Sequence, residues 1–380
     1  MPVPALGHHP AATPVAVVLG GPSAEHDVSI VSGSAIADAL IESGYPVETW
    51  LIDLDGEWWR LPDDFRRAGR PQAAYDDPAA LGAEGPLDAG VAIERLADRP
   101  RRPLAFLALH GPFGEDGVAQ ALCEAAGLAY TGSGVTASAV GMDKAIFKRL
   151  ARGLGIPVVD WFEVRAARWA AEPDAVLADL EAFVVAGGDA RLMVKPARLG
   201  SSVGMTLAHT AGERVAAIEE ALRYDDLVLA ERYLAGARDL EVSVIGNDPQ
   251  ALELYGPGEI MSGHEFYDYA AKYTPGLSSS TLAANVTPAQ AAACRVLAAD
   301  TYNAVGCEGF ARIDFLLGGD TLVVSEVNTI PGFTPISLFP TLPSAAGYDF
   351  AAVCRRVVDL ALERDRARVR HRLTAADLPR

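Results

Sequence analysis

Strand patterns and helix patterns alternate along the first third of this 380-residue chain. The first apolar run, Val15 to Leu19, ends at two glycines and is followed by a segment with helical spacing. Short runs that are apolar on both faces are typical of parallel strands covered by helices. The alternation therefore predicts an open α/β domain with a mainly parallel sheet. Strands are expected over 15–19, 46–52 and 104–109, and helices over 29–43 and 118–126, with loops and short helices over 55–103.

The pattern changes from Val158, after a helix that leads out of the first domain, and the length of the chain suggests two or three domains. The Gly/Ser/Tyr-rich segment 256–281 is predicted to be a long lid or a disordered loop. The first 13 residues are predicted to be a disordered tail. Further helices are expected over 138–154, 175–183, 288–305 and from 350, and strands over 158–164, 192–196, 203–207, 227–232, 240–245, 310–317 and 321–328.

Composition narrows the class of protein. The net charge of −18 argues against a nucleic-acid partner. No apolar run is long enough to span a membrane and no signal peptide is recognisable, so we expect a cytoplasmic protein. Four widely spaced cysteines suggest reduced, buried thiols. Only four of the 32 basic residues are lysines, which suggests that each lysine stands where arginine would not serve: Lys144, Lys148, Lys195 and Lys272.

A predicted hairpin carries polar residues where apolar ones are expected. In FARIDFLL, Arg312 and Asp314 share one face, and in TLVVSEVN, Glu326 and Asn328 share one face. If even positions pair with even positions, three oxygen donors and a guanidinium converge. Such a donor set suits Mg²⁺ and phosphate oxygens. An ordinary salt bridge from Arg312 to Asp314 or Glu326 is the open alternative.

Two other loops contain candidate ligand-binding residues. In MVKPARLGSSVGM, Lys195 precedes a Gly-Ser-Ser loop whose backbone N–H groups could cradle phosphate, although an ordinary hairpin turn would also fit. In ALHGPFGEDGVAQ, His110 follows a buried strand, as active-site loops of open α/β sheets do. Glu115 and Asp116 read more simply as capping groups of the following helix.

Two further segments complete the set. Glu25 follows the first strand, where the carboxyl edge of the sheet is expected. In EFYDYAAKYTPG, Lys272 and Tyr273 would belong to a lid, or the aromatic residues could merely anchor a long loop. No GxGxxG fingerprint follows a strand, so a dehydrogenase is disfavoured.

Taken in order, these motifs resemble the D-alanine–D-alanine ligase family of the ATP-grasp superfamily. The matching segments span residues 20 to 337. They are GGPSAEHDVS, HGPFGEDG, YTGSG with MDKAIFK, VKPARLGSSVG, EFYDYAAKY, RIDF and EVNTIPGFTPIS. The resemblance implies an N-terminal α/β substrate domain over 14–137 and a two-lobed ATP-grasp fold over 138–230 and 231–380.

The resemblance also implies a reaction. ATP phosphorylates one D-alanine, and the amine of a second D-alanine attacks the acyl phosphate to give the dipeptide for peptidoglycan precursor and cell-wall synthesis. A homodimer, with Mg²⁺ or Mn²⁺ at the nucleotide, is the family expectation. The implied metal ligands are Asp314, Glu326 and Asn328. The implied catalytic residues are Glu25, His110, Ser201, Tyr273, Arg312 and Gly332. The implied ATP contacts are Lys144, Lys195, Ser202, Glu231, Glu241 and Lys272, with Ser337 and Leu338 receiving the second substrate.

Alternatives remain at this stage. D-serine or D-lactate could replace the second D-alanine, although the tyrosine at position 273 favours an amine nucleophile. Another carboxylate–amine ligase of the superfamily, or a non-catalytic nucleotide-binding regulator, would share the fold. A regulator is expected to lack one of the four hairpin residues, and all four are present.

Overall fold

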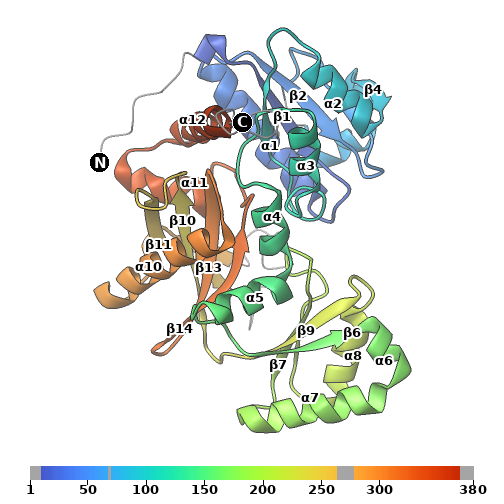
Figure 1. The fold of residues 1–380 in the computed structure, drawn as a ribbon, viewed down its shortest axis with the longest axis vertical. Helices are drawn as coiled ribbons and strands as arrows, with labels where there is room; N and C mark the ends of the chain where they lie inside the picture. Colours follow the sequence, from blue (N-terminus) through green and yellow to red (C-terminus); the bar gives the residue numbers. More distant parts are fainter. Residues whose placement is uncertain (1–9, 67–69, 263–277, 369–380) are drawn as a thin grey trace, which may run out of the picture.

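The structure is a computed structural model that describes residues 10–66, 70–262 and 278–368 (Figure 1). Three sheets organise it, each formed by a separate part of the chain. The expected mixed α/β class is confirmed. Of the tail predicted to be disordered, residues 10–12 form a short 3-10 helix, and residues 1–9 lie outside the described residues.

The N-terminal sheet has the strand order β4-β3-β2-β1-β5. Its central strand β1 pairs in parallel with both β2 and β5, which confirms the predicted parallel core. Strands β3 and β4 add antiparallel pairs at one edge, so the expectation of only loops and short helices over 55–103 was wrong there. The strands are β1 (Val15–Gly20), β2 (Val47–Ile52), β3 (Trp58–Arg60), β4 (Glu84–Leu87) and β5 (Leu104–Leu107).

Helices from both ends of the chain cover this sheet. The C-terminal helix α12 packs against α1, and both share one apolar core with β1 and β5 (Figure 1). The same core includes Phe310 and Phe333 from the C-terminal part, so it joins the two ends of the chain. The helices are α1 (His26–Glu42), α2 (Ala89–Ala97), α3 (Val118–Ala125) and α12 (Phe350–Arg368).

A bend replaces the single helix predicted over 138–154. Helix α4 (Val135–Met142) ends at Asp143, and helix α5 (Lys144–Gly153) begins directly after it. The Asp143 side chain accepts a hydrogen bond from the backbone N–H of Ile146, which caps α5. The break places Lys144 at the first position of α5, where its backbone N–H donates to Ala197 O.

The second sheet is antiparallel, with the order β6-β9-β7-β8, and forms the lower lobe in Figure 1. Strand β9 lies where it was predicted, whereas β8 begins three residues later than expected, because residues 197–205 form turns. Helix α8 was not predicted. The elements are β6 (Trp161–Arg165), α6 (Ala166–Ala171), α7 (Pro173–Gly187), β7 (Leu192–Pro196), β8 (Thr206–Ala208), α8 (Ala211–Ala221) and β9 (Leu227–Arg232).

The third sheet is antiparallel, with the order β12-β11-β10-β13-β14. The hairpin and helix α10 lie where the sequence predicted them. The long loop predicted over 256–281 was too long, because β11 and β12 occupy its two ends; residues 263–277 lie outside the described residues. The elements are β10 (Arg238–Ile245), β11 (Glu253–Ser262), β12 (Ser278–Thr281), α10 (Pro288–Val305), β13 (Phe310–Gly318), β14 (Thr321–Asn328) and α11 (Leu338–Thr341).

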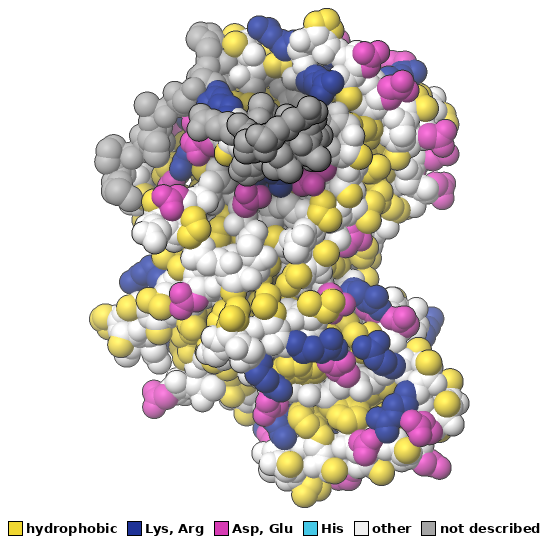
Figure 2. Space-filling view, in the orientation of Figure 1, with side chains coloured by type: hydrophobic (Ala, Val, Ile, Leu, Met, Phe, Trp, Pro, Cys, Tyr) yellow, Lys and Arg dark blue, Asp and Glu magenta, His cyan; other side chains and the backbone are white. Residues whose placement is uncertain are grey.

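Basic side chains gather over the lobe of the second sheet, with acidic side chains among them (Figure 2). Ion pairs there include Arg149–Glu163 at 2.5 Å and Arg168–Asp179 at 2.6 Å. The four cysteines are buried and unpaired, as predicted. Among the described helices, none has the length and apolar composition needed to cross a membrane.

Candidate active site

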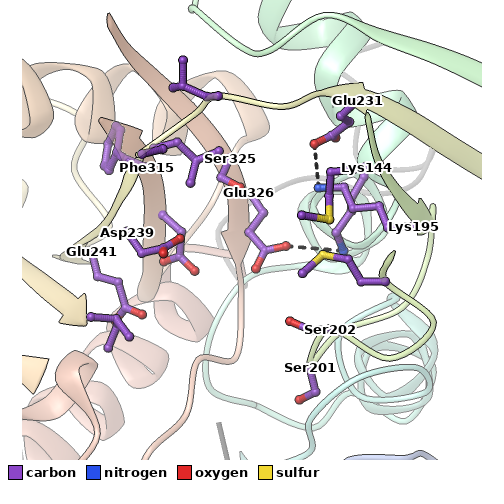
Figure 3. Close-up of a pocket in the computed structure, with 18 of the residues that line it drawn as sticks. Lys144, Lys195, Ser201, Ser202, Glu231, Asp239, Glu241, Phe315, Ser325 and Glu326 are labelled. Atoms are coloured by element: carbon purple, nitrogen blue, oxygen red, sulfur yellow. Dashed lines mark ion pairs between the residues drawn. The ribbon is translucent and has the colours of Figure 1, made fainter. Parts of the chain in front are cut away.

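A pocket lies between the second and third sheets (Figure 3). Lys144, Lys195 and Glu231 lie on one side of it, and Asp239 and Glu241 lie on the other. Two further pockets continue from it toward the N-terminal sheet, and Arg312 lines all three. The apolar part of the main pocket is formed by residues including Met193, Leu199, Val203, Met205, Leu234, Ile260, Phe315 and Leu316.

The hairpin residues converge because the register pairs even positions with even positions. Arg312 is opposite Asn328, and Asp314 is opposite Glu326. The register shifts immediately after Asp314, so this alignment is confined to the end of the hairpin that faces the pocket. Asn328 Nδ2 donates to Asp314 Oδ2 at 2.9 Å. The expected cluster of three oxygen-bearing side chains and a guanidinium therefore exists.

Arg312 is held by two carboxylates. Its Nε and Nη2 each donate to an Asp314 oxygen at 2.7 Å, and Nε lies 3.3 Å from Glu241 Oε2. Burial alone would lower the pKa of Arg312, but Asp314 and Glu241 outweigh it and hold the pKa well above its usual value. The salt-bridge alternative was thus also correct for Arg312 and Asp314. The guanidinium is a fixed cation beside the oxygen donors.

Lys144 reaches the same patch from α5. Its Nζ donates to Leu199 O at 2.8 Å and lies 3.4 Å from Glu326 Oε2. No group of three or more His, Cys, Asp or Glu residues is arranged for a metal ion in the part of the chain that the structure describes. The hairpin offers two carboxylates and an amide oxygen, which are hard donors that leave positions for water and phosphate oxygens. This chemistry fits Mg²⁺ bound together with a polyphosphate.

Glu231 is buried between two ammonium groups. Lys195 Nζ lies 2.9 Å from Oε2, and Lys148 Nζ lies 2.9 Å from Oε1. Burial would raise the pKa of Glu231, but the two lysines outweigh it and lower the pKa below its usual value. Glu231 is therefore an ionised acceptor in the wall of the pocket. Lys195 was predicted to bind phosphate and lines the pocket as expected.

Glu25 connects the N-terminal sheet to the Gly-Ser-Ser loop. Ser201 Oγ donates a hydrogen bond to Glu25 Oε1. A Cβ atom at Gly111 or at Gly200 would lie 2.5 Å from Glu25 Oε2, so the carboxylate fits closely between two glycines. Ser201 and Ser202 have φ angles of 50° and 57°, and such left-handed backbone conformations are strained for residues other than glycine.

His110 is buried and neutral. Its Nδ1 lies 2.9 Å from Ile330 O, a group that can only accept, so Nδ1 carries the proton. Its Nε2 lies 2.9 Å from Ser32 Oγ and accepts from that hydroxyl. Burial lowers the pKa of His110 and outweighs the opposing effect of Glu25. His110 lines the pocket that also contains Glu25, but both of its nitrogens bond within the protein.

Glu115 does not cap helix α3, contrary to the sequence prediction. Its two oxygens instead accept from the backbone N–H groups of Gly111 at 3.0 Å and Ile330 at 3.2 Å, which join two loops of the site. Loss of solvent, followed by repulsion from Glu25, raises the pKa of Glu115 to about 8. The capping prediction holds for Asp116, whose Oδ1 accepts from Val118 N at 3.0 Å.

The segment after β14 forms the far wall. Gly332 and Ser337 line both of the further pockets, and Leu338 lines one of them. Ser337 Oγ accepts from Thr334 N at 3.1 Å, and Leu338 begins the short helix α11. All three residues thus share one pocket with Arg312. Lys272 and Tyr273 lie outside the described residues.

Three residues of the site were not identified from the sequence. Lys148 was noted as a scarce lysine without a role, and it now pairs with Glu231. Glu115 was taken for a cap. Asp239 lines the main pocket two positions before Glu241 on the same face of β10. The alternation of β10 could have pointed to Asp239, whereas the loop contacts of Glu115 need the fold.

The fold and the site define an ATP-grasp ligase, with a pocket between two antiparallel sheets and an oxygen-donor cluster at its edge. Comparison with known proteins narrows this class. Residues 14–133 match the family described as D-ala D-ala ligase N-terminus, and residues 150–359 match D-ala D-ala ligase C-terminus. The chain belongs to the D-alanine–D-alanine ligase family.

Individual relatives are similar in sequence to this chain over nearly the whole length of both proteins. The D-alanine–D-alanine ligase of Kineococcus radiotolerans is 40% identical over 370 residues, covering 92% of this chain and 96% of the relative. That of Heliobacterium modesticaldum is 38% identical, covering 94% and 96%. Among solved structures, the ligase of Coxiella burnetii has a TM-score of 0.75 at 29% identity, covering 94% of this chain and 97% of the other. The VanG D-Ala:D-Ser ligase of Enterococcus faecalis has a TM-score of 0.77 at 29% identity, covering 92% and 99%.

Proposed function

We propose that this protein joins two D-alanine molecules into D-alanyl-D-alanine at the expense of ATP. The observation that carries the proposal is the convergence of Arg312, Asp314, Glu326 and Lys144 in the main pocket, where Arg312 also lines the two further pockets. One pocket would hold the nucleotide, and the other two would hold the amino acids. The membership of the chain in the D-alanine–D-alanine ligase family supports the choice of substrate.

In the first half of the reaction, a carboxylate oxygen of the first D-alanine attacks the γ-phosphorus of ATP, and ADP leaves. Glu25 would bind the ammonium of this D-alanine, because it is a carboxylate held in position by Ser201. Arg312 and Lys144 would offset the negative charge that builds up as the two anions approach. His110 would stay neutral beside the substrate and fix the loop that carries Gly332 through its bond to Ile330 O.

In the second half, the amine of the second D-alanine attacks the acyl phosphate carbon. The amine gives up a proton, and the tetrahedral intermediate expels phosphate to leave the amide. Arg312 and the backbone N–H of Gly332 would donate to the oxyanion. Ser337 and Leu338 would seat the second D-alanine. Tyr273, and Lys272, which was expected among the ATP contacts, lie outside the described residues.

Asp314, Glu326 and Asn328 would hold Mg²⁺ or Mn²⁺ together with the ATP phosphates. A bound divalent cation supplies charge neutralisation and orients the phosphate groups. The donor set fits such an ion because all three side chains offer oxygen and lie on one face of the hairpin. Arg312 and Lys144 balance the same two carboxylates in this structure.

The remaining nucleotide contacts follow from the main pocket. Glu231, ionised and buried, would accept from the adenine amine, while Lys195 and Ser202 would bind phosphate. Glu241 was expected to contact ATP, and the ribose is the part of ATP that the family resemblance implies for it. Its contact with Arg312 suggests a role in orienting that guanidinium, and Asp239 on the same side of the pocket is the alternative ribose contact.

A second candidate function is ligation of D-alanine to D-serine. The likeness to the VanG D-Ala:D-Ser ligase favours it, since that structure matches as well as the Coxiella burnetii ligase. D-lactate is a third possible second substrate, and one assay can compare all three. The rate of ATP-dependent phosphate release with D-alanine, L-alanine, D-serine and D-lactate, compared at several pH values, shows which of them is the second substrate. The proposal predicts the highest kcat/KM with D-alanine alone, and a preference for D-alanine plus D-serine would replace it.

We further propose a division of the chain at about residues 137 and 230 into an N-terminal substrate domain and two ATP-grasp lobes. The second boundary falls within β9 (Leu227–Arg232), so a cut just after this strand fits the sheet better. A cytoplasmic homodimer that serves peptidoglycan precursor synthesis completes the proposal. Size-exclusion chromatography with light scattering tests the dimer.

A further inference from the structure

Lys148 is a fully buried lysine that none of the proposed steps uses. It lies on α5, one helical turn after Lys144, and its side chain is 0% exposed. Of the three lysines that the structure describes, Lys144 and Lys195 line the main pocket and Lys148 does not. An unpaired ammonium in such a place would cost several kcal/mol, so its partners decide what it does.

The shortest contact of the Lys148 ammonium is with the Glu231 carboxylate. Nζ lies 2.9 Å from Glu231 Oε1, with Val159 O at 3.4 Å and the Trp161 ring centroid at 5.6 Å. Burial lowers the pKa of Lys148, and the Glu231 carboxylate opposes that effect. Lys148 therefore approaches Glu231 from behind the pocket wall, while Lys195 approaches the other oxygen from the pocket side.

This arrangement matters when an anion enters the pocket. Lys195 is the lysine expected to bind phosphate, yet it lies 2.9 Å from Glu231 Oε2. If Lys195 were the sole counter-ion of Glu231, turning toward phosphate would leave a buried carboxylate without compensation. Removing one partner of a buried pair is strongly destabilising. A second ammonium that cannot leave removes this conflict.

We propose that Lys148 is a positioning residue: the fixed counter-ion of Glu231, which frees Lys195 to bind a nucleotide phosphate. The inference rests on the proposed function, because it takes the main pocket as the ATP site. With Lys148 in place, Glu231 keeps its charge and its orientation after Lys195 turns away. It can then accept from the exocyclic amine of adenine, and it opposes the carbonyl that guanine presents at that position.

The direct test is Lys148→Met, which keeps an unbranched side chain and removes the charge. Nucleotide affinity is measured by calorimetry with a non-hydrolysable ATP analogue, and KM and kcat by phosphate release. We expect a roughly tenfold or larger loss of ATP affinity and a similar rise in KM. We expect kcat to stay within about twofold and the preference for ATP over GTP to fall. Unchanged ATP affinity would overturn the proposal.

A double-mutant cycle covers the case in which Lys148→Met does not fold. Glu231→Gln and the Lys148→Met/Glu231→Gln double variant are compared, since the double variant buries no unpaired ammonium at position 148. If Lys148 acts through Glu231, adding Lys148→Met to Glu231→Gln changes ATP affinity by less than about twofold. A further tenfold loss in that background would show that Lys148 acts independently, and would overturn the proposal.

A matched control is Arg214→Met in the same lobe. Arg214 is also buried, and it donates to Glu181 at 2.7 Å and to Ala190 O at 2.9 Å, away from the pocket. It should lower the thermal midpoint without changing ATP affinity. Wild-type protein that binds the ATP analogue but ligates no amino acid would refute the proposed reaction and leave the role of Lys148 open to the same binding test.

Discussion

Lys144 Nζ lies 3.4 Å from Glu326 Oε2. This contact joins the start of α5 to strand β14, at the position that is paired with Asp314 of β13. The contact pairs a lysine of one lobe with a proposed metal ligand of the other lobe. Its position explains why α4 and α5 are separate helices: the break at Asp143 is what allows Lys144 to begin α5 beside the loop after β7. The bend therefore places Lys144 in the wall of the main pocket.

Replacing Glu326 tests the metal assignment. Glu326→Gln keeps the shape of the side chain and removes one negative charge from the donor set, so we expect ligation to fall by about 10³-fold or more. The Mg²⁺ concentration needed for half-maximal rate should rise as well. Asp320→Asn in the exposed turn of the same hairpin is the control and should keep full activity. Full activity of Glu326→Gln would refute the assignment.

Arg312 tests the role of the fixed guanidinium. Arg312→Lys keeps the charge but loses the two parallel bonds to Asp314 and the second donor needed at the oxyanion. We expect kcat to fall by about 10²-fold or more while the KM for ATP changes little, because the lost contacts form in the transition state. Steady-state kinetics checks both constants. A rise in KM with unchanged kcat would assign Arg312 to substrate binding instead.

The fit of Glu25 between two glycines gives a third prediction. Gly200→Ala would place a methyl group 2.5 Å from Glu25 Oε2, so the carboxylate must move. We expect kcat/KM for the first D-alanine to fall by about tenfold or more. Gly153→Ala is the matched control, since nothing lies within 4 Å of a Cβ atom there. Equal activity of the two variants would show that Glu25 does not position the substrate.

Glu115 gives a pH-dependent prediction for stability. Its pKa is raised to about 8 from 4.5, so the folded protein binds this proton more tightly than the unfolded chain. The stability that it contributes is present below pH 4.5 and is lost as the pH rises through 8. Glu115→Gln should therefore gain about 3–4 kcal/mol relative to wild type between pH 5 and pH 8. Urea unfolding at both pH values measures this, and a parallel pH dependence in the two proteins would contradict it.

The sequence predicted the elements whose patterns are local. The hairpin, α10 and β9 were found because their apolar periodicity is complete within each segment. Strands β3 and β4 were missed because each has only three or four residues and depends on its neighbours for pairing. The break at Asp143 was missed because its cap is a single side chain inside a continuous helical pattern.

The contacts of the candidate site also differ in how far the sequence could predict them. The convergence of Asp314 and Glu326 could be predicted because a hairpin register and strand alternation determine it. The contact of Ser201 with Glu25 joins residues 176 positions apart, so only the assigned family could suggest it. The bonds from Gly111 and Ile330 to Glu115 and the pair of Lys148 with Glu231 depend on the packing of separate segments, and no local pattern marks them.

The central claim is that ATP activates the carboxylate of D-alanine as an acyl phosphate. Ligation with D-alanine labelled with ¹⁸O in both carboxylate oxygens tests it most directly, by mass spectrometry of the phosphate released. The mechanism predicts one ¹⁸O atom in each phosphate and one in the amide carbonyl of D-alanyl-D-alanine, because the attacking oxygen leaves with phosphorus. Unlabelled phosphate released together with the dipeptide would contradict the account.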